Sequence, residues 1–269
     1  MKLIKPRVIP FLTSLTCAIG FYSCAPSSSP AVNNSNGQIN TVRTSNDLVA
    51  QGITQFESMK KQKRISTNSL QNAQIQRVAA RLKQTINLPG AKWEFVLFED
   101  STPNAFALPG GKVGIHTGLL PITQSDAGLA AVLGHEIAHV TQNHAGSRRN
   151  QAVGLALGGL LLDQVAKYSG ADTSDRTALG TAYGAGAAIG FALPHSRKNE
   201  LEADRIGTVY MAKAGYDPNE AVAMWQRFSD YNNRNGNSSP EFLRTHPLDT
   251  TRINALKTYL PTALREYNG

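Results

Sequence analysis

Apolar residues recur at helical spacing along most of the chain. From Asp47 to Gln84 they follow a helical period, which Pro89-Gly90 ends. The period is clearest at Ile75, Val78, Ala79, Leu82 and Ile86. A second run starts near Thr123-Gln-Ser-Asp126 and carries an apolar stripe of Leu129, Val132, Leu133, Ile137 and Val140. Both runs predict amphipathic helices.

The C-terminal third continues this pattern. One helical run contains Glu200 and ends near Ala214-Gly215. The next covers Pro218–Tyr231, and its inward positions are Ala221, Met224, Trp225 and Phe228. Asn232–Pro240 is rich in Asn, Gly and Ser and predicts a mobile loop, and a last helix begins near Thr250.

Three short stretches break the helical pattern. Trp93–Phe98, Ala105–Leu108 and Lys112–His116 are rich in β-forming residues, and Pro109-Gly110-Gly111 separates the last two. They predict three strands, the last two joined by a turn. The fold class is therefore α+β, mostly helical with a small β-sheet. An edge strand of this sheet can pair with an extended peptide, or the sheet can be purely structural.

Two further runs, Gln151–Ala166 and Thr177–Leu193, are rich in Gly, Ala and Leu. Small residues at these spacings permit close approach of helices. Asp163 and Lys167, and the shortness of the second run, argue against membrane spans. The runs predict either a hydrophobic helical pair or flap that contacts lipid or unfolded protein, or helices packed in the core.

The sequence His135-Glu136-Ile137-Ala138-His139 lies within the second helical run. On a helix, His135 and His139 are one turn apart, so both imidazoles project from the same face. This spacing is typical of a pair of zinc ligands, and Glu136 between them is placed to act as a general base. The pattern predicts one zinc ion per chain.

A third ligand is offered by Glu200 and Asp204, which are again one helical turn apart. One of these carboxylates can bind the metal while the other accepts a hydrogen bond from a ligating imidazole. Glu202 lies about 200° around the helix from Glu200 and cannot share its face. We therefore expect Glu200 to be the ligand and Glu202 to be solvated or salt-bridged.

His135-Glu136-x-x-His139 followed by Ser196-Arg197-x-x-Glu200-x-x-Ala203-Asp204-x-x-Gly207 resembles the HtpX / CAAX prenyl protease family of zinc metallopeptidases. Within that family, the chain is most similar to the BepA-like envelope (periplasmic) branch. Two more stretches carry the resemblance, Asn104–Gly118 and Thr245-His246-Pro247. It extends from about residue 45 to the C-terminus, and no helical repeat is visible.

The resemblance implies a role for each residue of the site. His135, His139 and Glu200 would be the zinc ligands and Glu136 the general base. Asp204 would support a ligating imidazole, and His246 would approach the site from a mobile loop. Arg252 could bind a carboxylate or an oxyanion, or form a surface salt bridge. The remaining histidines, His116, His144 and His195, have no partner motif and are expected to be ordinary core or surface residues.

The N-terminus predicts export. Residues 1–23 combine a basic start with a short apolar run, which is typical of a secretory signal peptide. Cys24, followed by a Ser/Pro/Asn-rich stretch, predicts a lipid-anchored lipoprotein, although Phe21-Tyr22-Ser23 departs from the usual leucine three positions before the cysteine. Simple secretion is the alternative. Residues 24–45 would be a flexible tether and residues 46–269 the metallopeptidase domain.

Composition adds the compartment and the partners. The two cysteines, Cys17 and Cys24, leave the exported domain without a disulfide. Loss of Lys2, Lys5 and Arg7 with the signal, which contains no acidic residue, lowers the net charge from +8 to +5. That excess favours an anionic membrane surface. The charges are scattered and no nucleic-acid motif is present, so nucleic acid is not expected as a partner.

These observations together predict an exported, periplasmic, membrane-anchored zinc metalloendopeptidase. The resemblance implies misfolded or misassembled envelope proteins as substrates. One alternative is a chaperone-like envelope lipoprotein that binds but rarely cuts, and another is a catalytically silent scaffold. The intact Glu136 and the three candidate ligands argue against silence.

Overall fold

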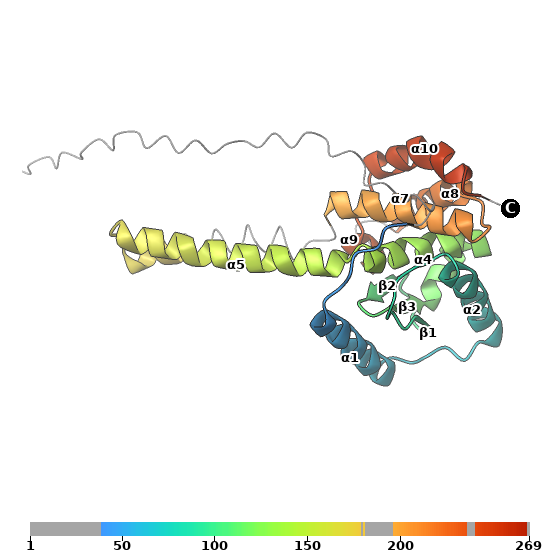
Figure 1. Cartoon of the computed structure of the whole chain (residues 1–269), viewed down its shortest axis with the longest axis horizontal. Coiled ribbons are helices and arrows are strands. Elements are labelled where there is room, and N and C mark those ends of the chain that lie inside the picture. Colours follow the sequence, from blue (N-terminus) through green and yellow to red (C-terminus); the bar gives the residue numbers. More distant parts are fainter. Residues whose placement is uncertain (1–38, 179, 181–195, 236–239, 268–269) are drawn as a thin grey trace, which may run out of the picture. The chain divides into compact units, whose positions relative to one another are not determined.

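The computed structural model describes residues 39–178, 180, 196–235 and 240–267. These residues belong to one compact unit. Helix α4 lies between the β-sheet on one side and helices α7, α8 and α10 on the other (Figure 1). The α+β prediction, mostly helical with a small sheet, is confirmed.

The first helical stretch is two helices, α1 (Asn46–Gln62) and α2 (Ser69–Lys83). They are separated by a segment in which Ile65 forms an isolated antiparallel bridge with Phe98. The Asn68 side chain accepts a hydrogen bond from Gln71 N at 3.0 Å and so caps the start of α2. The sequence pattern predicts Asp47–Gln84 as one helical stretch and does not place this break.

The sheet contains β1 (Glu94–Phe98), β2 (Ala105–Leu108) and β3 (Lys112–His116), in the order β1-β3-β2. β1 pairs with β3 in parallel, from Glu94↔Lys112 to Phe98↔His116. β2 pairs with β3 antiparallel, from Ala105↔Ile115 to Leu108↔Lys112. Gly110 and Gly111 form the turn between them at φ +89° and +82°, where a side chain would be strained. The predicted strands and turn are confirmed.

A short 3₁₀ turn, η1 (Thr117–Leu119), and α3 (Leu120–Thr123) lead into α4 (Asp126–Thr141). Ser125 begins α4, because its side chain accepts a hydrogen bond from Gly128 N at 3.0 Å. The expected amphipathic character is wrong, since α4 is buried on every side from Gly128 to Thr141. Its polar face is covered by α7, which brings the other half of the candidate site.

Four helices follow the segment around residues 181–195: α7 (Arg197–Lys213), α8 (Asn219–Arg234), α9 (Glu241–Thr245) and α10 (Thr250–Leu264). A Cβ on Gly134 would lie 2.6 Å from Gly207 O, and one on Gly207 would lie 2.6 Å from His135 N. Two glycines therefore let α4 and α7 touch backbone to backbone. The predicted inward face of α8 is buried; it consists of Ala221, Met224, Trp225 and Phe228.

Helix α5 (His144–Tyr168) contains the first Gly/Ala/Leu-rich run. The alternative that this run packs in the core is wrong, because Leu157, Leu160 and Leu161 are 56%, 64% and 67% exposed. Most of the second run, Thr177–Leu193, lies outside the described residues, as does the centre of the predicted loop at Asn232–Pro240. Among the helices that the structure describes, none combines the length and apolar character that a membrane span requires.

The segment before α1 contacts the rest of the domain. Residues 39–45, assigned to the tether, lie against the domain: Ile39 is buried in the core and Val42 N donates to Thr141 O at 2.7 Å. Asn40 O also accepts a hydrogen bond from Gln142 Nε2 at 2.9 Å. The polar composition of this segment concealed these contacts, which are mostly made by its backbone. The predicted signal peptide and Cys24 lie outside the described residues.

Candidate metal centre

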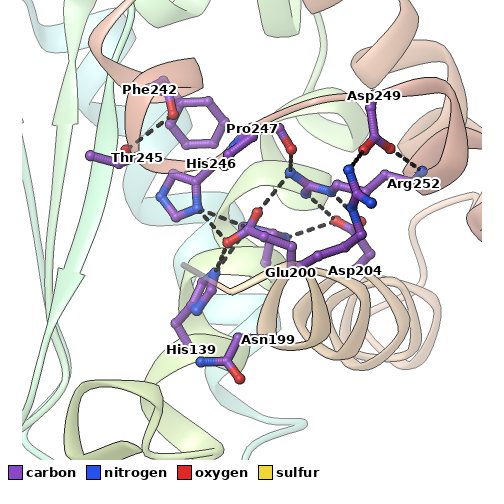
Figure 2. Close-up of polar contacts among 12 residues, drawn as sticks. His139, Asn199, Glu200, Asp204, Phe242, Thr245, His246, Pro247, Asp249 and Arg252 are labelled. Atoms are coloured by element: carbon purple, nitrogen blue, oxygen red, sulfur yellow. Dashed lines mark hydrogen bonds and ion pairs between the residues drawn. The ribbon is translucent and has the colours of Figure 1, made fainter. Parts of the chain in front are cut away.

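Three elements bring four buried side chains to one point. His135 and His139 come from α4, Glu200 from the first turn of α7, and His246 from the residue that ends α9. One donor atom from each lies within 4.8 Å of the others, a group that can hold a metal ion. The convergence of Glu200, His139 and His246 is visible in Figure 2. The predicted α4–α7 pairing of ligands is thus present in the fold.

The donor distances fit zinc. His135 Nε2 lies 3.0 Å from His139 Nε2, and Glu200 oxygens lie 3.3 Å from His139 Nε2 and 3.5 Å from His135 Nε2. Tetrahedral zinc with bonds of about 2.0–2.1 Å requires neighbouring donors roughly 3.3 Å apart. Two imidazoles and a carboxylate are also the donor types that zinc prefers. The types and spacing of these donors are therefore compatible with one zinc ion.

His246 lies directly on this group. Its Nδ1 is 3.1 Å from Glu200 Oε1 and 3.3 Å from His135 Nε2, and its Nε2 is 3.4 Å from Glu136 Oε1. The ring packs on Phe242 at 4.6 Å between centroids, and the backbone N–H donates to Phe242 O at 2.8 Å. The residue is only 3% exposed. In this conformation His246 is part of the buried cluster, whereas the sequence placed it on a mobile loop.

Asp204 and Arg252 support the other side of the cluster. Asp204 Oδ1 is 2.9 Å from His135 Nδ1, so the carboxylate orients the ring whose Nε2 faces Glu200. Arg252 donates hydrogen bonds to both oxygens of Asp204 at 2.7 and 2.8 Å and to Pro247 O at 2.8 Å, and its Nη1 forms an ion pair with Glu200 Oε2 at 2.7 Å (Figure 2). Arg252 is 2% exposed, so the alternative of a surface salt bridge is wrong.

The electrostatics of the cluster favour a cation. Burial would lower the pKa of His135, but Asp204 and Glu200 outweigh it and raise that pKa to about 9. Burial would likewise raise the pKa of Glu200, yet His246, His135 and His139 hold it well below its usual value. Glu200 and Asp204 therefore remain charged, and their field attracts positive charge to the donors.

Glu136 is buried beside the donors at 1% exposure. Burial raises the pKa of its carboxyl group, and the nearby His246 and His135 reduce this effect without reversing it. A carboxylate whose pKa is raised toward neutrality is a better proton acceptor at physiological pH than an ordinary one. The side chain is thus placed and tuned for proton transfer.

His144 also lies beside the donors, and no sequence motif placed it there. It was expected to be an ordinary histidine, but its Nδ1 lies 2.8 Å from Nδ1 of His139. On one continuous helix, five residues would place the two rings on different faces; the break at Asn143 between α4 and α5 brings them together. Glu202, which we expected to be solvated or salt-bridged, has its Oε2 3.3 Å from His144 Nε2, within hydrogen-bond distance of that ring. No motif signalled this contact.

The other two histidines lie elsewhere. His116 is buried, with its Nδ1 3.4 Å from an Asp100 oxygen and 3.2 Å from Thr102 O, and is an ordinary core residue as predicted. His195 lies outside the described residues.

A pocket beside His139 connects the cluster to the sheet. Its lining includes Ala107 of β2, Pro109, Asn143 and Arg148. β2 is an edge strand of the described sheet, so one side of its backbone is not paired within that sheet. A second pocket of about 600 Å³ shares Thr44 and Val140 with the first and extends along the β2–β3 turn.

Known proteins are similar to this chain in sequence. Residues 69–260 match the profile of Peptidase family M48, which spans both α4 and α7. The mitochondrial metalloendopeptidase OMA1 of Saccharomyces cerevisiae is 39% identical over 186 residues, which cover 67% of this chain and 50% of that protein.

Bacterial proteases are also similar to this chain in sequence. The putative beta-barrel assembly-enhancing protease of Vibrio cholerae is 37% identical over 189 residues, covering 68% of this chain and 37% of its own length. The beta-barrel assembly-enhancing protease of Escherichia coli K12 is 33% identical over 187 residues. The chain spans half or less of the length of these relatives. The expected resemblance to this branch is confirmed, and the chain belongs to peptidase family M48.

Proposed function

We propose that the chain is a zinc metalloendopeptidase with one zinc ion, held by His135, His139 and Glu200. The observation that carries the proposal is the convergence of these three donors, 3.0–3.5 Å apart and buried, beside the carboxylate of Glu136. Membership of a peptidase family supports the reaction, since the matched residues 69–260 include every side chain of the metal cluster.

When bound, zinc supplies Lewis-acid polarisation of the scissile carbonyl and lowers the pKa of the attacking water. Glu136 would take a proton from the attacking water and pass it to the leaving amine, and burial, which raises the pKa of its carboxyl group, would make it a stronger base for the first transfer. Asp204 holds the ring of His135 through Nδ1, and Arg252 keeps Asp204 charged and in place. These residues form a rigid, buried platform for the reaction.

The position of His246 supports a resting state in which the metal site is closed. A catalytic zinc site keeps one position open, yet His246 lies within 3.4 Å of Glu136, Glu200 and His135. We propose that His246 acts as a fourth donor in this conformation and withdraws when a substrate binds. Withdrawal would place its imidazole at the rim of the site, where it can donate a hydrogen bond to the developing oxyanion.

The substrate would bind along β2. An extended peptide can add to the edge of this strand through backbone hydrogen bonds, with side chains in the pocket of about 600 Å³ that Gly110 of the β2–β3 turn helps to line. Backbone pairing requires an extended, unfolded segment. This supports misfolded or misassembled proteins as substrates, and the bacterial relatives, named as beta-barrel assembly-enhancing proteases, support envelope proteins in particular.

We also propose the domain order that the sequence predicts, with a signal peptide at residues 1–23, a lipid anchor on Cys24 and a periplasmic, membrane-anchored peptidase. The basic start, the short apolar run and the Ser/Pro/Asn-rich stretch after Cys24 support it. In cells given labelled fatty acid, the wild-type protein should be labelled and sediment with membranes, and Cys24→Ser should do neither. An unlabelled wild-type protein would leave simple secretion.

The experiment for the function is zinc content together with casein cleavage, using protein that begins at Cys24. We expect one zinc per chain and cleavage that a chelator abolishes and added zinc restores. A protein that holds zinc and binds unfolded casein without cutting it would favour the chaperone-like alternative.

A further inference from the structure

A second chain of contacts leads away from the metal donors, through His144 to Glu202. His139 Nδ1 lies 2.8 Å from His144 Nδ1, and His144 Nε2 lies 3.3 Å from Glu202 Oε2. His144 is 2% exposed in its side chain and Glu202 is 24% exposed. The His139 and His144 rings are nearly perpendicular, with centroids 4.8 Å apart. The contacts therefore follow the edges of both rings.

The backbone explains how His144 reaches this place. Asn143 adopts a left-handed conformation at φ 52°, which ends α4 and begins α5. Its side chain then caps α5 by accepting a hydrogen bond from Gly146 N at 3.2 Å. The change of direction turns the ring of His144 back onto His139. Glu202, on the helix that supplies Glu200, completes the chain from the α7 side.

The proton positions in this chain follow from hydrogen-bond chemistry. A carboxylate only accepts, so Glu202 requires the proton of neutral His144 to be on Nε2. His144 Nδ1 is then an acceptor, and the 2.8 Å contact requires His139 to carry its proton on Nδ1. The lone pair of His139 is thereby left on Nε2, the atom that lies 3.0 Å from His135 Nε2.

We propose that His144, oriented by Glu202, is a positioning residue that holds His139 in the tautomer whose Nε2 lone pair faces the metal. It does for His139 what Asp204 does for His135, whose Nδ1 lies 2.9 Å from that carboxylate. The inference rests on the proposed function, because it concerns zinc binding by His139. It gives Glu202, which the sequence treated as a surface acid, an indirect role in the metal site.

Substitutions at Glu202 separate this role from a structural one. Glu202→Lys replaces the acceptor with a donor, so His144 would carry its proton on Nδ1 and force the proton of His139 onto Nε2. The zinc dissociation constant, measured by competition with a chromogenic chelator, should rise about 10- to 100-fold. Glu202→Gln keeps an acceptor oxygen and should bind zinc within about threefold of wild type, following the same reasoning.

Substitutions at His144 provide the second pair. His144→Leu removes the acceptor and should weaken zinc binding to a similar extent, whereas His144→Asn restores an acceptor oxygen and should recover part of the affinity. The matched control is Glu220→Lys, because the Glu220 side chain is 25% exposed, close to the 24% of Glu202, and contacts a basic side chain, Arg227, away from the metal donors. It should leave zinc affinity unchanged, and metal-free Glu202→Lys should melt at a temperature similar to this control.

The outcomes are distinct. Weak zinc binding in Glu202→Lys, with normal binding in Glu202→Gln and Glu220→Lys, supports the proposal. Normal binding in Glu202→Lys overturns it, and so does equal weakening in Glu220→Lys, which would indicate a general charge effect. If His144→Leu does not fold, the Glu202 variants decide. If wild-type protein binds no zinc, it is the proposed function that fails.

Discussion

Arg252 is the cation on which the buried carboxylates of the site depend, and its removal should be the most destabilising single change in the cluster. The guanidinium is 2% exposed, bonds both oxygens of Asp204 and reaches Glu200 Oε2 at 2.7 Å. It also packs over the Trp225 ring at 4.6 Å. Arg252→Met would keep much of this packing but leave two buried carboxylates with one cation fewer.

The expected loss of unfolding free energy follows from the one missing cation. Removing one partner of a buried ion pair costs about 3–5 kcal/mol, because the remaining charge stays desolvated. Since a domain of this kind is stable by only about 5–15 kcal/mol, the loss is a large fraction of the whole. Loss of the bond to Pro247 O should in addition release the segment that carries His246.

The assay is equilibrium unfolding of the metal-free protein in urea, because bound zinc would itself neutralise Glu200 and conceal part of the loss. The control is Arg77→Met, since Arg77 also grips a carboxylate with two nitrogens, on Asp126, but its side chain is 55% exposed. The exposed pair should contribute far less. Equal unfolding midpoints for the two variants would refute the reasoning that burial makes Arg252 indispensable.

Three further predictions concern the ligands and pH. Glu200→Gln should weaken zinc binding substantially in a chelator competition, because it removes the charged donor, and unchanged affinity would mean that another carboxylate binds the metal. His246→Ala should keep zinc, since three donors remain, and should cleave casein more slowly because the oxyanion loses a hydrogen-bond donor; faster cleavage would mean that His246 only blocks the fourth position. Arg77 lowers the pKa of Asp126 through its hydrogen bonds, so this pair stabilises the fold above the unfolded pKa of about 3.9, and the contribution is lost as pH falls through the folded value. The unfolding free energies of wild type and Asp126→Asn should therefore differ most near neutral pH and converge as pH falls below the folded pKa of Asp126; a constant difference would contradict this.

The parts of the site that repeat along one helix could be predicted from the sequence. The one-turn spacings of His135 with His139 and of Glu200 with Asp204 identified one face of each of two helices. The structure brings these two helix faces together. The three strands and the helix starts at Ser125 and near Thr250 were also readable, because caps and glycines are local signals.

The rest depended on contacts between elements. Nothing local distinguishes a helix that faces solvent from α4, which α7 covers through the Gly134–Gly207 approach. His144 joins the site only because Asn143 turns the chain in a left-handed conformation, which few sequences announce. The exposure of Leu160 and Leu161 on α5 was likewise unreadable, since an apolar helical run has the same pattern in a core and on a surface.

The most direct test of the central claim is casein hydrolysis by Glu136→Gln at a zinc occupancy equal to that of wild type. Glu136 is buried beside the donors and is not among the four side chains grouped as metal donors, so the variant should hold zinc normally. Its amide cannot take the proton from the attacking water, and the account predicts that cleavage falls by a factor of at least about 100. Robust cleavage by zinc-loaded Glu136→Gln would contradict the account.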